Sequence, residues 1–198
     1  MRVAAIVLAA GRSSRMAPRN KLLEPVGGEP MVRRVARVAI ASGARPVVAV
    51  TGHETAAVAT ALRGLDVTAI VNPDYAQGLS TSLRAGLSAL PSGVDGALIL
   101  LGDMPGIDVV VLCALIAAFA GADAICVPVR HGRRGNPVLW GSNYFAAMMG
   151  LTGDVGAKPL MARYQDRLVE VEVATDSIFE DVDAPAELAR LKQPGAAS

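Results

Sequence analysis

The sequence has few of the residues that build disulfide frameworks, zinc sites or broad charged surfaces. Its formal net charge is +1, so composition does not predict a basic surface for nucleic-acid binding. The two histidines, His53 and His131, are too isolated to indicate a metal cluster. Cys113 and Cys126 form no CxxC pair and lie in apolar stretches, so we expect two buried, unreactive thiols.

Long hydrophobic runs are also missing. The longest nearly apolar run, Val109–Ala120, falls short of the roughly 20 residues that cross a membrane, and we expect a buried helix there. The apolar start leads into a charged loop without a signal cleavage site, which indicates a cytoplasmic protein with neither a membrane nor a nucleic-acid partner. Since neither a repeat nor a linker is evident, we expect one domain over residues 1–192 and a frayed tail over 193–198.

Short β-branched runs alternate with longer helix-like stretches, which is typical of βαβ units and a mostly parallel sheet. The runs are almost continuously apolar, as expected for strands that helices cover on both faces. The sequence therefore predicts a single-domain, Rossmann-like α/β fold with three layers. The predicted strands are residues 2–9, 46–51, 66–72, 95–101 and 123–128. Helices are expected after Glu29, with arginines on the outer face, near Ser80, near Ile107 or Asp108, and at Pro185.

The loop after the first predicted strand combines small residues with basic ones. Leu8, Ala9, Ala10 and Gly11 allow backbone N–H groups to approach an anion, while Arg15 and Lys21 bring positive charge. This pattern predicts a phosphate cradle, although it is neither a Walker A loop nor a GxGxxG fingerprint. A surface loop with solvated basic residues is the alternative.

Carboxylates follow or precede other predicted elements. Asp103, in Gly102-Asp103-Met104-Pro105, stands where a buried strand ends and is placed to hold Mg²⁺; helix capping is the alternative. Asp183 precedes the last predicted helix and offers a second carboxylate, or a simple N-cap.

Polar loops elsewhere suggest contacts with a base or an acceptor. Gly78, Ser80 and Ser82 open a predicted helix and can present N–H and O–H groups to a base or ribose, with helix capping by Ser80 as the alternative. The basic turn over residues 130–138 includes Arg134 and Asn136 and can meet an acceptor phosphate; otherwise it is a solvated hairpin tip.

Several of these motifs together resemble the MobA-like nucleotidyltransferases. The family signature L-A-[AG]-G-x-S-x-R-M-G followed by lysine is matched at Leu8–Met16 and Lys21, with Ala17 in place of the last glycine. The resemblance implies the nucleotide-diphospho-sugar transferase type of fold, phosphate clamping by Arg15 and Lys21, and Mg²⁺ ligation by Asp103 and Asp183. It also implies that the stretch with Gly78, Ser80 and Ser82 lies by the base.

The finer resemblance is to the molybdenum cofactor cytidylyltransferases. Leu-Ala-Ala-Gly and the Gly78–Leu83 stretch resemble that branch, which implies transfer of CMP from CTP to a molybdopterin-type cofactor that a molybdoenzyme then receives. Asp154, in Gly153–Lys158, resembles an element near the acceptor pocket and can pair with a pterin-like ring, or it is an ordinary Asp at a helix N-terminus. Asn136 stands where that branch has histidine, which is a departure in the acceptor region.

Three other functions compete with this one. A guanylyltransferase using GTP, or another small-acceptor transferase, would share the phosphate loop and the metal carboxylate. A nucleotide- or cofactor-binding protein without turnover is disfavoured by the presence of Lys21, Asp103 and Asp183. A nicotinamide-dependent dehydrogenase rests only on the α/β alternation, and the sequence lacks GxGxxG.

Overall fold

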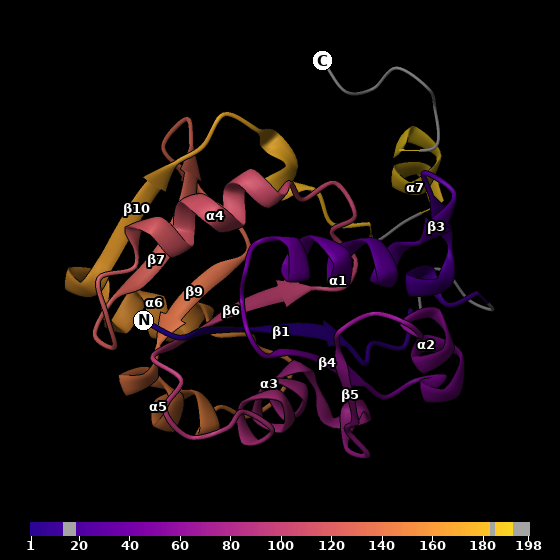
Figure 1. Cartoon of the computed structure of the whole chain (residues 1–198), viewed down its shortest axis with the longest axis horizontal. Helices are drawn as coiled ribbons and strands as arrows, with labels where there is room; N and C mark the ends of the chain where they lie inside the picture. The colour runs from indigo at the N-terminus through magenta and orange to yellow at the C-terminus, as the bar shows by residue number, and fades with distance from the viewer. Residues whose placement is uncertain (14–18, 183–184, 192–198) are drawn as a thin grey trace.

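The computed structural model describes residues 1–13, 19–182 and 185–191 (Figure 1). One sheet dominates it, with strands in the order β10-β7-β9-β6-β1-β4-β5 and β8 paired to β7. The sheet strands are β1 (Val3–Ala9), β4 (Val47–Thr51), β5 (Thr68–Val71), β6 (Gly96–Leu101), β7 (Ile125–Arg130), β8 (Arg133–Arg134), β9 (Val138–Gly141) and β10 (Leu168–Glu172). A separate small hairpin pairs β2 (Pro25–Val26) with β3 (Glu29–Pro30).

The sheet is mostly parallel, which confirms the predicted fold class. β1 pairs in parallel with both β4 and β6, whereas β9 lies antiparallel between β6 and β7. Every predicted strand is present. The edge strand β10 was not among them, because Glu170 and Glu172 interrupt its apolar residues and its side chains are only partly buried.

Helices cover both faces of the sheet (Figure 1). The alternation of β1 divides the core, because Val3, Ala5, Val7 and Ala9 pack in one cluster and Ala4, Ile6 and Leu8 pack in the other. The first cluster includes α1 (Met31–Ala41), α2 (Thr55–Ala61) and α4 (Val109–Ala118); the second includes α3 (Leu79–Ser88), α5 (Phe145–Met149) and α6 (Lys158–Arg163). Close packing on both sides holds the end of β1 in place.

Helix α4 is less buried than its apolar sequence predicts. It packs Val111, Leu112 and Leu115 into the core, but Val110 is 68% exposed and Cys113 also faces solvent. The expectation of a buried Cys113 was therefore wrong, because a helix on a sheet buries one face only. Cys126 is buried in β7, and burial raises its pKa to about 11. Within the described ranges, none of the helices has the length and apolar character needed to cross a bilayer.

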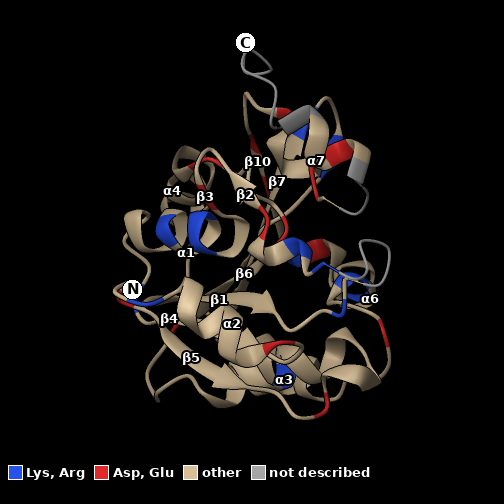
Figure 2. Cartoon of the chain, turned by 90° about the vertical axis from the view of Figure 1, so that its right-hand side faces the viewer, with Lys and Arg blue, Asp and Glu red and all other residues tan. Residues whose placement is uncertain are grey.

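The arginines of α1 form hydrogen bonds and an ion pair with neighbouring elements in addition to facing solvent. Figure 2 shows them as blue positions on this helix. Arg33 donates to the carbonyls of Ala61 and Arg63, each at 2.9 Å, and Arg37 pairs with Glu29 at 2.7 Å. The outer face of α1 thus ties this helix to α2 and to the small hairpin.

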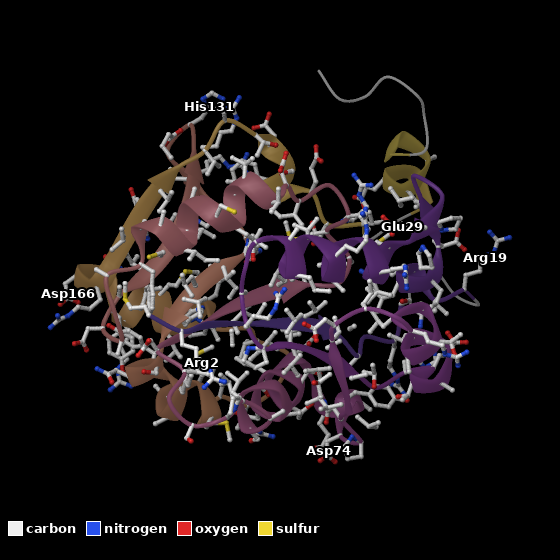
Figure 3. The ribbon with its side chains drawn as sticks, in the orientation of Figure 1. Arg2, Arg19, Glu29, Asp74, His131 and Asp166 are labelled. Atoms are coloured by element: carbon white, nitrogen blue, oxygen red, sulfur yellow. The ribbon has the colours of Figure 1, made fainter. Side chains whose placement is uncertain are left out.

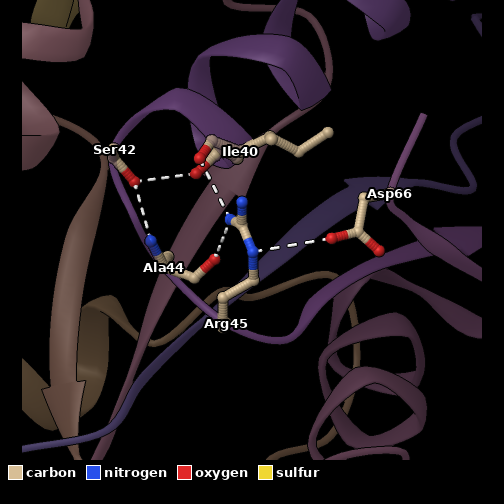
Figure 4. A network of polar contacts seen from close by, with 6 residues as sticks. Ile40, Ser42, Ala44, Arg45 and Asp66 are labelled. Carbon is tan, nitrogen blue, oxygen red and sulfur yellow. Dashed lines mark hydrogen bonds and ion pairs between the residues drawn. The ribbon is translucent and has the colours of Figure 1, made fainter.

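A polar network ends α1 and leads into β4 (Figure 4). Arg45 donates to the carbonyls of Ile40 at 3.0 Å and Ala44 at 2.7 Å, and its Nε lies 3.5 Å from Asp66 Oδ2. Ser42 Oγ donates to Ala39 O at 2.7 Å. The bonds to Ala39 O and Ile40 O use carbonyls of the last turn of α1.

Gly141 is required for close packing where β9 meets the segment before β7. A Cβ at this position would overlap the backbone carbonyl of Ala122 and lie 2.9 Å from the Ala124 oxygen. We expect Gly141→Ala to lower the free energy of unfolding by about 3 kcal/mol, because both obstacles are backbone atoms. Urea denaturation measures this change. Gly150→Ala is the matched control, since the nearest atom to its Cβ is 3.4 Å away. An equal loss of unfolding free energy in both variants would show that the backbone atoms beside Gly141 are not the cause.

Candidate active site

A cavity of about 630 Å³ opens where β1 and β6 end. Ligands of open α/β sheets bind beyond the carboxyl ends of the strands, so its position is the expected one. Its lining comes from the loop after β1, the turn after β6, the start of α3 and a distant loop. The lining residues are Leu8, Ala10, Gly11, Arg12, Ser13, Lys21, Leu22, Tyr75, Ala76, Gln77, Gly78, Leu79, Ser82, Leu101, Asp103 and Asp154.

The loop after β1 brings small residues to this cavity. Leu8, Ala10 and Gly11 line it, whereas Ala9 is fully buried in the opposite core cluster. Gly102, directly after β6, permits the close approach, because a Cβ there would lie 3.0 Å from Leu8 O. Its N–H donates to the same oxygen at 2.9 Å. The ends of β1 and β6 are thereby fixed side by side.

Two side chains connect the loop to η2 (Lys21–Leu23) and position Lys21. Ser13 Oγ accepts from the Lys21 N–H at 3.1 Å and donates to Asn20 Oδ1 at 3.3 Å. Asn20 Oδ1 also accepts from the Leu22 N–H at 3.1 Å, so Asn20 caps η2. The predicted phosphate clamp Arg15 lies outside the described residues.

Lys21 and Asp103 form an ion pair within the cavity. Lys21 Nζ lies 2.7 Å from Asp103 Oδ2, and the side chains are only 12% and 19% exposed. Asp103 Oδ1 is buried and has no hydrogen-bond partner among residues 1–13, 19–182 and 185–191. A buried carboxylate oxygen with an open lone pair suits a hard cation such as Mg²⁺. The capping alternative for Asp103 is wrong, because Asp108 caps α4 by accepting from the Val110 N–H at 3.0 Å.

Two distant segments fix the turn that carries Asp103. The Val182 N–H donates to Asp103 O at 2.9 Å, and Arg34 Nε of α1 donates to Pro105 O at 2.7 Å. Asp183, the predicted second metal ligand, lies outside the described residues. The bond from Val182 nevertheless brings the chain beside Asp103 immediately before that position.

The start of α3 places some of its predicted polar groups in the cavity. Ser82 lines the cavity, and the buried amide of Asn72 donates to Thr81 Oγ1 at 2.8 Å and to Ser82 Oγ at 3.0 Å. Ser80 is fully buried, its hydroxyl has no hydrogen-bond partner in the part of the chain that the structure describes, and it is not a lining residue. Ser80 does not cap the helix either, because the cap position is Gly78.

Asp154 reaches α3 from a loop far along the chain. Its Oδ1 accepts from the Leu79 N–H at 3.1 Å, across 75 residues. Asp154 therefore lies at a helix N-terminus, as the alternative interpretation expected, but the helix is α3 and not α6, which begins only at Lys158.

A family model described as MobA-like NTP transferase domain matches residues 5–168, which include every lining residue of the cavity. The chain belongs to the MobA-like NTP transferase domain family.

Solved structures and relatives agree with this family assignment. The MobA-like domain is 27% identical to a nucleotidyl transferase from Methanothermobacter thermautotrophicus, with a TM-score of 0.84 and 96% of each chain covered. It is 26% identical to Rv0371c from Mycobacterium tuberculosis, solved in complex with manganese, with a TM-score of 0.80 over 96% of this chain and 98% of that one. Nicotine blue oxidoreductase from Paenarthrobacter nicotinovorans is 28% identical over 201 residues and 96% of both chains. The chain spans about a quarter of the length of the bifunctional GlmU proteins that it matches.

Two predicted acceptor residues of the MobA-like domain, Arg134 and Asn136, are not among the lining residues of this cavity. Arg134 on β8 pairs with Glu170 of β10 at 2.7 Å, and the Asn136 N–H donates to Ile178 O at 2.9 Å. The β7–β8 hairpin therefore packs on β10 and η6 (Asp176–Phe179), and Figure 3 shows His131 of its tip at the edge of the molecule. A role toward an acceptor stays a prediction for both residues.

Sequence reasoning missed several residues that build the cavity of the MobA-like domain. Arg12 and Ser13 belong to the motif of the loop after β1 and line the cavity, although the motif predicts no role for either. Tyr75 and Gln77 belong to the turn η3 (Tyr75–Gln77), which follows a predicted strand end. Their position after a predicted strand is the sequence feature that could have identified them, because ligands of open α/β sheets bind beyond the carboxyl ends of the strands.

Proposed function

We propose that the chain transfers CMP from CTP to the terminal phosphate of a molybdopterin-type cofactor and releases pyrophosphate. The observation that carries the proposal is the Lys21–Asp103 pair, at 2.7 Å, in a cavity where Asp103 keeps a buried oxygen that no described residue contacts with a hydrogen bond. A fixed cation and a carboxylate that can bind Mg²⁺ are the groups that phosphoryl chemistry on an NTP requires. The family assignment supports an NTP as the donor.

The chain's own side chains supply charge and position in this reaction. Lys21 and Arg12 face the cavity and neutralise the phosphates, and the small residues Ala10 and Gly11 leave room for them beside the backbone. Asp103, with Asp183 as the proposed second ligand, would hold Mg²⁺, which would supply positive charge for the phosphate oxygens.

Bond formation needs no protein nucleophile. An acceptor phosphate oxygen forms a bond to the α-phosphorus, the bond to the bridging oxygen of the β-phosphate breaks, and pyrophosphate leaves with both electrons. Because the acceptor phosphate is already ionised near neutral pH, no general base has to remove a proton. Catalysis then consists of positioning and charge neutralisation.

The nucleotide lies with its base toward α3 in this proposal. Asp154 already occupies the N-terminal turn of α3 with a carboxylate, which disfavours a phosphate at the same place. The triphosphate therefore lies by Lys21, and Gly78 and Ser82 lie by the base and ribose. Cytosine is proposed from the resemblance of the Gly78–Leu83 stretch to the cytidylyltransferase branch, and GTP is the alternative nucleotide.

Pyrophosphate release tests the proposal. The purified protein is assayed with Mg²⁺, a molybdenum-loaded pterin cofactor, and CTP, GTP, ATP or UTP in turn, with a parallel series without the acceptor. We expect release with CTP to exceed release with the other nucleotides by at least about tenfold, and only when the acceptor is present. A preference for GTP would assign the chain to the guanylyltransferase branch. Nucleotide binding without release would indicate a binding protein.

A redox function is the second candidate, because nicotine blue oxidoreductase matches the chain over 96% of both lengths. The sequence lacks the GxGxxG fingerprint, which argues against a Rossmann-type nicotinamide site. Consumption of NADH or NADPH with a quinone-like dye, without pyrophosphate release from any NTP, would favour the redox function over the transferase.

A further inference from the structure

Helix α3 begins without a cap from its own sequence neighbourhood. Its N-cap residue is Gly78, which has no side chain to accept from the first N–H groups. Asp154 supplies the missing acceptor, with its Oδ1 3.1 Å from Leu79 N. An acidic side chain at this end is also favourable because it faces the positive pole of the helix.

Further contacts join the loop over residues 151–157, here called the support loop, to the same helix. The Ser80 N–H donates to Gly153 O at 3.3 Å, and Arg84 Nη1 donates to Leu151 O at 3.0 Å. Gly78 is in the left-handed region, with φ of 115°, and a Cβ there would lie 2.5 Å from the Gly153 carbonyl. The backbones of the two segments are therefore in direct contact.

The supported turn is part of the cavity. Gly78, Leu79 and Ser82 line it, and so does Asp154. Leu79 N–H is used by Asp154, so this carboxylate oxygen is engaged within the protein rather than left open for a pterin ring. The position of the turn thus depends on a residue from another part of the chain.

We infer that Asp154 is a positioning residue for the nucleotide: it holds the first turn of α3 in the arrangement that binds the base and ribose. This inference rests on the proposed function, since it assigns Asp154 to the nucleotide half of the site instead of the acceptor half. The support loop therefore contributes to nucleotide affinity, and a substitution that makes this loop less ordered lowers the affinity for the NTP.

Two substitutions separate the hydrogen bond from the charge. Asp154→Ala removes the acceptor, whereas Asp154→Asn keeps an oxygen that can accept from Leu79 N–H. With CTP and Mg²⁺ but no acceptor, we expect Asp154→Ala to bind CTP about fivefold more weakly in calorimetry, because ordering the uncapped turn on binding costs a free energy of the size of a lost helix cap. We expect Asp154→Asn to bind like the wild type. In turnover, Asp154→Ala raises KM for CTP and leaves kcat nearly unchanged.

Asp166→Ala is the control, because it also removes an exposed carboxylate and lies at the periphery, where Asp166 pairs with Arg167 at 3.2 Å (Figure 3). Unchanged CTP binding in Asp154→Ala, with a raised KM for the acceptor, would overturn the inference. An equal loss of CTP affinity in Asp154→Asn would also overturn it, because the charge of Asp154 rather than its hydrogen bond to Leu79 N–H would then determine the affinity.

Hydrogen exchange of the Leu79 and Ser80 amides gives a readout that needs no nucleotide. We expect faster exchange at both amides in Asp154→Ala and wild-type exchange in Asp154→Asn and Asp166→Ala. If the wild type binds no NTP while Asp154→Ala still exchanges faster, the proposed function fails and the support of α3 stands. Unchanged exchange in Asp154→Ala overturns the support itself.

Discussion

We expect Asp103→Asn to lower kcat for pyrophosphate release by about 10³- to 10⁴-fold, through the loss of several kcal/mol of charge stabilisation. The amide keeps the size of the side chain but loses the negative charge that a hard cation requires. Among the described residues, Asp103 Oδ1 is buried without a partner, and Oδ2 lies 2.7 Å from Lys21 Nζ. The substitution therefore removes the charge offered to a cation and weakens the contact with Lys21 without enlarging the cavity. Steady-state release over a series of Mg²⁺ concentrations measures the loss.

Asp108→Asn is the matched control for this substitution. Asp108 lies in the same turn region, is exposed, and caps α4 through the Val110 N–H at 3.0 Å. Asparagine caps helices as well as aspartate does, so we expect wild-type turnover and stability. If Asp103→Asn retained more than about a tenth of the wild-type kcat at every Mg²⁺ concentration, Asp103 would not be the essential metal ligand.

The strands and the first loop could be predicted because their signals are local. Buried parallel strands read as continuous apolar runs, and residues after such strands converge on one sheet edge. This reasoning placed Gly11, Lys21 and Asp103 around one point, and the structure brings all three to the cavity. Edge strand β10 carries a weaker pattern, since one of its faces meets solvent.

Residues that act across long sequence separations could not be placed in this way. Asp154 caps a helix that begins 75 residues earlier, and no local pattern records that partnership. The acceptor role predicted for Arg134 rested on its charge, and the ion pair of Arg134 with Glu170 of β10, at 2.7 Å, could not be predicted from its sequence neighbours. Both outcomes follow from tertiary packing, which a motif of neighbouring residues does not encode.

Lys21→Met is the second substitution for which we expect a large loss, about 10³-fold in kcat/KM for the NTP. Methionine has a similar length and apolar stem, so the variant removes the charge and retains most of the packing. Lys21 is 12% exposed, and a cation with this little solvent around it interacts more strongly with phosphate than a surface lysine does. Initial rates of pyrophosphate release at subsaturating CTP give kcat/KM.

Loss of Lys21 also leaves the Asp103 carboxylate without the ammonium that lies 2.7 Å from it, so a fall in activity could arise from lower stability. Thermal unfolding of Lys21→Met separates the two causes, because a transferase defect persists at temperatures where the variant is fully folded. Lys21→Arg retains the charge, and we expect it to recover part of the lost activity, since a planar guanidinium binds phosphate in a different geometry. Arg63→Met, in the exposed segment after α2, is the control for losing a cation elsewhere and should retain wild-type kcat/KM. Equal activity of Lys21→Met and the control would show that the cavity binds phosphate without this residue.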